Sequence, residues 1–109
     1  MRLGLEGRRG LVTGGSKGLG EAIARELAGE GARVAICSRN EEEVLATAEE
    51  VGAEYAQAAD VTDADQVRDV VARSAAALGG LDFLVNNAGG AHPGTFETLT
   101  DVAKKVGSG

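Results

Sequence analysis

The sequence is poor in the residues that build disulfide frameworks, metal centres and aromatic cores. Its 109 residues include one cysteine (Cys37), one histidine (His92), one proline and no tryptophan, and aromatic residues make up 3%. A single cysteine excludes an internal disulfide framework, and one cysteine with one histidine excludes a Cys/His zinc site, so we expect no metal. The core must therefore be built from alanine, valine, leucine and isoleucine.

Positive charge is also scarce, because 17 acidic residues outnumber 11 basic residues and give a net charge of -6. Without a basic patch, binding to nucleic acid or to an anionic membrane surface is not expected. No apolar run approaches the roughly 18 residues of a membrane span, and the N-terminal sequence lacks the apolar stretch of a signal peptide. We therefore expect a cytoplasmic protein in a reducing compartment.

Hydrophobic patterns predict alternating strands and helices. Short apolar runs at 11–13, 34–37 and 83–85 predict strands, and 54–58 predicts a weaker one. Between them, apolar residues recur at helical spacing in three sets: Leu19, Ile23 and Leu27; Val44, Ala48 and Val51; Val67, Val70, Val71 and Leu78. Two pairs, Asn40 with Glu43 and Thr62 with Asp65, have the spacing of capping boxes, and glycines follow each helix.

This β-α-β-α-β-α-β order predicts an α/β fold with a parallel sheet. Right-handed crossovers predict the strand order 3-2-1-4, which is half of a doubly wound Rossmann-type fold, in three αβα layers with two helices on one face and the third on the other. We expect one domain over residues 1–100. Residues 101–109 are expected to form a short tail whose Gly-Ser-Gly end is typical of a linker and indicates a truncated or engineered terminus.

A glycine-rich loop, Thr13-Gly14-Gly15-Ser16-Lys17-Gly18-Leu19-Gly20, joins the first strand to the first helix. Gly14 allows a tight turn, and Gly18 and Gly20 allow a ligand and a neighbouring strand to approach the backbone. The start of the helix offers N–H groups and a partial positive charge that suit a pyrophosphate. Glycines also serve in ordinary turns, so it is the strand-loop-helix context that favours a phosphate site.

The end of the second strand bears on which cofactor would bind. It carries Ser38 and Arg39 in place of the acid that holds the ribose 2′-hydroxyl of NAD. Arg39 and Lys17 are able to contact a 2′-phosphate, each for about 0.5–1.5 kcal/mol at a partly exposed site. Together they predict a preference for NADP(H) over NAD(H) of roughly 5- to 150-fold. The alternative is that both are ordinary surface charges.

Polar residues also follow the third and fourth strands. Asp60 lies at the carboxyl edge of the predicted sheet, where it is placed to accept a hydrogen bond from an adenine amine or to serve as a turn residue. Asn86 and Asn87 lie at the same edge. The residues alone favour a structural role for this pair, tying neighbouring strands together, over contact with a ribose.

In this order the motifs resemble the short-chain dehydrogenase/reductase family, over about residues 5–100. The resemblance implies a Rossmann fold that binds a nicotinamide cofactor, with Asp60 and Val61 at the adenine and the Asn87-Ala88-Gly89 segment beside the adenosine. Lys17 with Arg39 resembles the basic pair of NADP-preferring members, and the most similar type is a 3-oxoacyl-[acyl-carrier-protein] reductase or a related carbonyl reductase. The expected cofactor-binding residues are Gly14, Ser16, Lys17, Gly18, Leu19, Gly20, Ser38, Arg39, Asp60, Val61, Asn87, Ala88 and Gly89.

The family's catalytic residues are missing from the sequence. Members are more than twice as long, and their catalytic serine and Tyr-x-x-x-Lys motif come later than residue 109. The single tyrosine, Tyr55, is followed four positions later by Ala59, and His92 has no partner at a recognisable spacing. We therefore assign no catalytic residue and expect the NADP(H)-binding portion of a short-chain oxidoreductase that is inactive by itself.

The alternative is a non-catalytic fragment or an engineered minimal Rossmann fold. In either case the fourth strand, Phe83-Leu84-Val85, would present an exposed edge, and one sheet face would carry a single helix. We expect self-association through this edge and the bare face, as a homodimer or a higher homo-oligomer.

Overall fold

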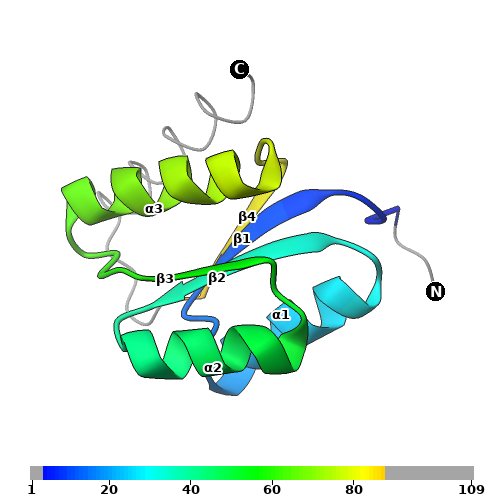
Figure 1. Ribbon diagram of the computed structural model, residues 1–109, viewed down its shortest axis with the longest axis horizontal. Helices are drawn as coiled ribbons and strands as arrows, with labels where there is room; N and C mark the ends of the chain where they lie inside the picture. Colours follow the sequence, from blue (N-terminus) through cyan, green and yellow to red (C-terminus); the bar gives the residue numbers. More distant parts are fainter. Residues whose placement is uncertain (1–3, 88–109) are drawn as a thin grey trace.

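Strands and helices alternate strictly along residues 4–87, which are the residues that the computed structural model describes (Figure 1). The elements are β1 (Arg9–Thr13), α1 (Gly18–Gly29), β2 (Arg33–Ser38), α2 (Glu41–Val51), β3 (Tyr55–Ala58), α3 (Ala64–Leu78) and β4 (Phe83–Asn86). All strand pairs are parallel, and the sheet order is β3-β2-β1-β4. The predicted Rossmann-type fold with order 3-2-1-4 is therefore confirmed.

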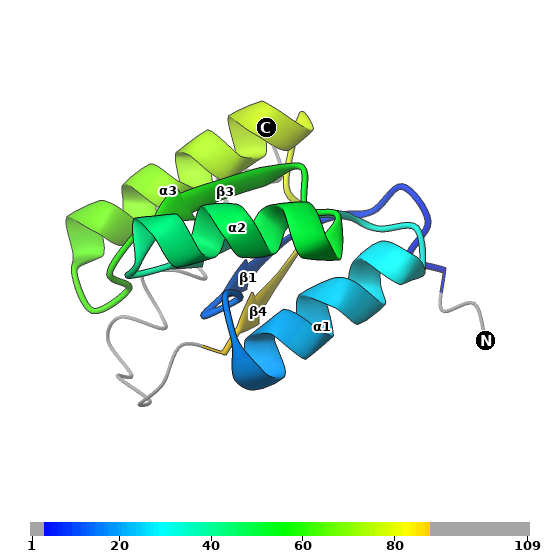
Figure 2. The ribbon, with the colours of Figure 1, turned by 60° about the horizontal axis from the view of Figure 1, so that its bottom comes forward.

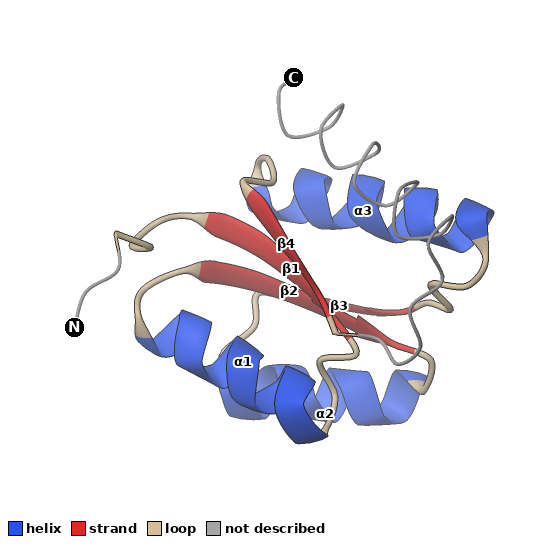
Figure 3. Cartoon of the chain, turned by 180° about the vertical axis from the view of Figure 1, so that it is seen from behind, coloured by secondary structure: helices blue, strands red, loops and turns tan. Residues whose placement is uncertain are grey.

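The sheet lies between two helical layers, with α1 and α2 on one face and α3 on the other (Figures 2 and 3). Alternate residues of the central strands supply the two cores, because successive side chains of a strand point to opposite faces. Val12, Val34 and Ile36 pack in the core under α1 and α2. Leu11, Ala35 and Cys37 pack in the core under α3. The strands are apolar on both faces because helices cover both faces.

The start of α2 agrees with the prediction in part. Asn40 is its N-cap, and the side chain of Asn40 accepts a hydrogen bond from the Glu43 backbone N–H at 2.9 Å. The reciprocal half of the predicted capping box is absent. The Glu43 carboxylate instead accepts a hydrogen bond from the hydroxyl of Ser16, in the glycine loop.

The predicted cap of the third helix is wrong by one residue. Asp63 caps α3, because its side chain accepts hydrogen bonds from the backbone N–H groups of Asp65 and Gln66. Thr62 instead donates its backbone N–H and its hydroxyl to Asp60, at 2.9 and 2.7 Å. The side chain of Thr62 thus closes the loop after β3 and does not cap the helix.

The apolar face predicted for the first helix also differs in one position. Leu19 is 69% exposed, whereas Gly20 and Ala24 are buried against the sheet. Successive helical residues are about 100° apart, so a contact face centred on Gly20 and Ala24 leaves Leu19 at its margin. Small residues at the centre of this face allow α1 to lie close to the strands. None of the helices within residues 4–87 is long and apolar enough to cross a membrane.

Candidate functional site

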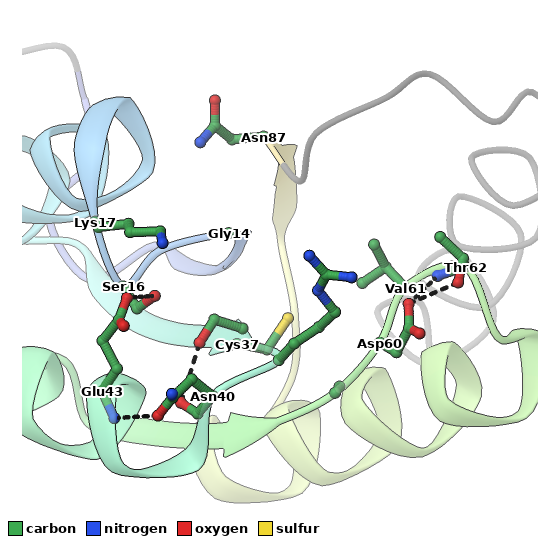
Figure 4. Close-up of a pocket in the computed structure, with 13 residues that line it drawn as sticks. Gly14, Ser16, Lys17, Cys37, Asn40, Glu43, Asp60, Val61, Thr62 and Asn87 are labelled. Carbon is green, nitrogen blue, oxygen red and sulfur yellow. Dashed lines mark hydrogen bonds between the residues drawn. The ribbon is translucent and has the colours of Figure 1, made fainter.

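A cavity of about 600 Å³ opens at the carboxyl ends of the strands (Figure 4). It lies beside the point where the sheet order reverses, since β1 has β2 on one side and β4 on the other. Ligands of open α/β sheets bind in the crevice at such a switch point. The lining residues are Gly14, Ser16, Lys17, Cys37, Ser38, Arg39, Asn40, Glu43, Ala59, Asp60, Val61, Thr62 and Asn87.

The glycine loop depends on close approach between two of its own glycines. Gly14 has φ of 66°, in the left-handed region that favours glycine. A Cβ atom on Gly20 would lie 1.9 Å from the carbonyl oxygen of Gly14 and 2.6 Å from the side-chain amide nitrogen of Asn87. Gly20 therefore does not line the cavity; it lets α1 pack directly beneath the loop that does.

The loop is also held from its other side by β2 and α2. The Gly15 backbone N–H donates to the Cys37 carbonyl oxygen at 3.2 Å. Thr47, a buried residue of α2, donates its hydroxyl to the Ser16 carbonyl oxygen at 2.9 Å. The Ser16 hydroxyl donates to Glu43 Oε1, also at 2.9 Å. These contacts fix the loop conformation from within the protein.

Asp60 brings a negative charge to the β3 side of the cavity. The side-chain and backbone hydrogen bonds from Thr62 lower the pKa of Asp60, and the nearby Arg39 guanidinium lowers it further. Both bonds from Thr62 end on Oδ1 of Asp60. The carboxylate is thus ionised and oriented by its own loop. Figure 4 shows Asp60 and Thr62 on the opposite side of the cavity from Lys17 and Ser16.

Cys37 lines the cavity as a neutral group. The residue is fully buried, and burial raises the pKa of its thiol to about 12. A thiol with such a pKa is almost entirely protonated near neutral pH, so Cys37 is not an activated nucleophile. Its contribution to the site is packing.

Asn86, the last residue of β4, and Asn87, which follows it, tie that strand to β1. The Thr13 hydroxyl donates to the Asn86 side-chain oxygen at 2.9 Å and accepts a hydrogen bond from the Asn87 backbone N–H at 2.9 Å. Thr13 is fully buried, and it lies directly opposite Asn86 in the register of the two strands. This confirms the strand-tying role that the residues favoured, while Asn87 also lines the cavity.

Most of the predicted cofactor residues meet at this cavity, namely Gly14, Ser16, Lys17, Ser38, Arg39, Asp60, Val61 and Asn87. Gly18, Leu19 and Gly20 do not line it, and Ala88 and Gly89 lie outside the described residues. Sequence reasoning missed Cys37, Asn40, Glu43, Ala59 and Thr62 as lining residues. Four of these lie within four residues of a strand end, so the strand-end argument was able to predict them. Glu43 belongs to α2, and only the folded chain brings it to the loop.

The sheet order and the position of the cavity define a Rossmann-type α/β protein with a site at its switch point. The sequence profile of the family described as short chain dehydrogenase matches residues 9–105. The chain therefore belongs to the short-chain dehydrogenase family.

Similar proteins include several dehydrogenases. The chain is 38% identical to a 2,3-dihydro-2,3-dihydroxybenzoate dehydrogenase of Bacillus subtilis, over 90% of this chain and 39% of that protein. It is 43% identical to a glucose 1-dehydrogenase of Gluconobacter oxydans, over 85% of this chain and 37% of that protein. The chain thus spans about two fifths of the length of these curated relatives.

Solved structures show the same likeness. A short chain dehydrogenase from Burkholderia cenocepacia in complex with NADP is 35% identical, with a TM-score of 0.85 over 94% of this chain and 51% of that one. An F189W actinorhodin polyketide ketoreductase with NADPH is 31% identical, with a TM-score of 0.82 over 93% of this chain and 48% of that one. The chain therefore spans about half of each solved chain.

Proposed function

We propose that this chain is the NADP(H)-binding portion of a short-chain oxidoreductase. The observation that carries the proposal is the cavity at the switch point, where the glycine loop, two basic residues and Asp60 face one space. Family membership and the NADP- and NADPH-bound neighbours support a nicotinamide dinucleotide as the ligand.

The start of α1 suits the pyrophosphate of such a cofactor. Lys17, the N-cap of α1, makes no side-chain capping bond, whereas Asn40 and Asp63 cap α2 and α3 with theirs. The first N–H groups of α1 are thus left for another acceptor, and helix N-termini attract anions through these groups and the helix dipole. We assign the pyrophosphate to this helix end and to Gly14, Ser16 and Lys17, the loop residues that line the cavity.

The adenosine half of the cofactor would occupy the space across β2 and β3. In this proposal Asp60 would accept a hydrogen bond from the adenine amine through Oδ2, since both bonds from Thr62 end on Oδ1, and Val61 would form an apolar wall. Arg39 and Lys17 are both exposed at the cavity and would contact a 2′-phosphate. We propose on this basis that NADP(H) binds more tightly than NAD(H).

The chemistry proposed for the whole enzyme is hydride transfer between an alcohol or carbonyl substrate and the cofactor. When bound, the nicotinamide would supply or accept the hydride, and the residues that line the cavity would bind and orient the cofactor. As a substrate class we propose a 3-oxoacyl or related carbonyl compound, which the likeness to the polyketide ketoreductase supports. Assays of the whole enzyme would test the substrate class by itself, by comparing the NADPH-dependent reduction of such compounds with the NADP-dependent oxidation of a sugar and of a cyclic diol.

Calorimetric titration of the 109-residue chain with NADPH and, separately, NADH tests the cofactor proposal. We expect saturable binding of both, with the lower Kd for NADPH. If circular dichroism shows that the chain is folded and the chain binds neither cofactor, the proposal is wrong. The alternative of a non-catalytic, self-associating fold would then be favoured.

We also propose that the chain forms a homodimer or higher homo-oligomer through β4. Within residues 4–87, β1 is the one strand that pairs with β4. The strand residues Phe83, Leu84 and Val85 are half-buried and apolar. An apolar edge strand of this kind is a template for pairing with a second copy.

A further inference from the structure

We propose that Glu43 is a specificity-determining residue of the cavity, which weakens the preference for the phosphorylated cofactor. Its carboxylate places a negative charge in the cavity that Lys17 and Arg39 also line. This inference rests on the proposed function and extends it to a residue of α2.

Two hydrogen bonds locate Glu43 beside the glycine loop and the residues that follow β2. On one side its carboxylate accepts the hydrogen bond from Ser16, the residue before Lys17. On the other side its backbone N–H donates to Asn40, the residue after Arg39. The Ser38 hydroxyl in turn donates to the Asn40 carbonyl oxygen at 3.3 Å. Glu43 therefore adjoins both segments that carry the basic residues, as Figure 4 shows for Ser16, Asn40 and Glu43.

The contact with Ser16 keeps the carboxylate inside the site. Glu43 is half-buried and lines the cavity, whereas Glu41 and Glu42, in the same helical turn, are exposed and do not line it. An exposed glutamate side chain spreads its charge over many rotamers in solvent. The hydrogen bond from Ser16 instead holds the Glu43 charge at one place beside the loop.

The charge of Glu43 acts differently on the two cofactors. A phosphate monoester carries about -1.5 to -2 charges near pH 7, so a carboxylate that lines the same cavity opposes its binding. A ribose 2′-hydroxyl is neutral and is able to donate a hydrogen bond to the same carboxylate. Glu43 therefore offsets part of the attraction of Lys17 and Arg39 for NADP(H) without a matching cost for NAD(H).

The test compares Glu43→Gln with the wild-type chain by calorimetric titration with NADPH and NADH. Glutamine keeps an Oε1 acceptor for the Ser16 hydroxyl but removes the charge. We expect the Kd for NADPH to fall relative to that for NADH by a factor of about 3 to 10, and the gain to shrink in about 0.5 M salt. Glu43→Ala also removes the contact with Ser16, and it should weaken the binding of both cofactors.

Glu42→Gln is the matched control. It removes the same charge from the same turn of α2, so its effect on the helix dipole is comparable, but the residue does not line the cavity. The ratio of the two Kd values should stay as in the wild type.

The outcomes separate this inference from the function on which it rests. If the wild-type chain binds NADPH and Glu43→Gln leaves the ratio of the two Kd values unchanged, the inference is overturned and the proposed function stands. An equal loss of both affinities in Glu43→Gln would also overturn it, since it would show a purely structural role. If the folded wild-type chain binds neither cofactor, the proposed function itself is overturned.

Discussion

Arg9 and Asp82 form a two-point ion pair at the amino-terminal edge of the sheet. Arg9 Nε donates to Asp82 Oδ2 at 3.0 Å, and Arg9 Nη2 donates to Oδ1 at 3.1 Å. The Arg9 backbone N–H donates to Oδ2 as well, at 2.8 Å. Arg9 Nη1 reaches the Gly79 carbonyl oxygen at the end of α3. One side chain thus joins the start of β1 to the segment that leads into β4.

This pair predicts a loss of stability in acid. The hydrogen bonds from the Arg9 side chain and backbone lower the pKa of Asp82 to about 2. The unfolded chain has a pKa near about 3.9 for this group, so the unfolded state binds the proton more tightly than the folded state. The contribution of Asp82 to stability is therefore present above about pH 4 and is lost as the pH falls towards about 2.

Urea denaturation of the wild type and of Asp82→Asn across this pH range checks that prediction. The difference in unfolding free energy should be level from about pH 5 to 7 and should shrink below about pH 4. The same substitution in an Arg9→Met background should show less of this pH dependence, because only the backbone hydrogen bond to Asp82 remains. A difference that is independent of pH would refute the role of the pair.

Two buried hydroxyls predict opposite effects on stability. Ser74 Oγ in α3 is buried and has no hydrogen-bond partner among the described residues. We expect Ser74→Ala to stabilise the fold by about 1 kcal/mol, because an unsatisfied buried hydroxyl costs free energy. The hydroxyl of Thr47 donates to the Ser16 carbonyl oxygen, so Thr47→Val should destabilise by about 1–3 kcal/mol. Urea midpoints that move in the same direction for both variants would contradict this reading.

Gly20 and Gly29 of the same helix offer a matched test of the glycine loop. A Cβ at Gly20 would collide with the Gly14 carbonyl oxygen, whereas a Cβ at Gly29 would meet no atom within 4 Å. Gly20→Ala should therefore displace the loop and weaken both NADPH and NADH by about tenfold or more. Gly29→Ala should leave both affinities unchanged and add up to about 1 kcal/mol of stability. Unchanged binding in Gly20→Ala would show that the loop is not the site.

Arg39 predicts a loss that is selective for the phosphorylated cofactor. Arg39→Met keeps the aliphatic stem and removes the charge, so NADPH affinity should fall by about 2- to 12-fold with little change for NADH. Arg68→Met is the control, because Arg68 lies on α3 and does not line the cavity. Titration calorimetry gives both values, and an equal loss for the two cofactors would argue against contact with a 2′-phosphate.

The edge of β4 that no strand of residues 4–87 pairs with predicts self-association. Size-exclusion chromatography with light scattering should give a mass of two or more copies of the 11.0 kDa chain, increasing with concentration if the contact is weak. A folded monomer at every concentration would be evidence against pairing through β4.

Local signals in the sequence were sufficient for the order of the elements and for much of the site. The strand run ending at Thr13, the N-cap at Asn40 and the glycine loop depend on interactions within a few residues, and the structure has them where they were predicted. The strand-end argument also placed Arg39 and Asp60 at one cavity, because parallel strands bring their carboxyl ends to one edge.

The errors arise where a local pattern fits two neighbouring positions. Thr62 has the spacing of a cap, but its hydroxyl donates a hydrogen bond to Asp60, and Asp63 is the residue that caps α3. Leu19 has the spacing of a core residue, but the small residues Gly20 and Ala24 set which side of α1 meets the sheet. In both cases the pattern was compatible with two neighbouring positions, and packing selected one.

The sequence by itself determined the alternation of strands and helices, the parallel sheet and the family, because hydrophobic spacing and turn residues are local. Only the tertiary structure decided that the Glu43 carboxylate accepts a hydrogen bond from Ser16, 27 positions earlier in the chain, and not from the N-cap of its own helix. No local pattern specifies such a contact, because it exists only once α2 and the glycine loop pack against the same sheet edge.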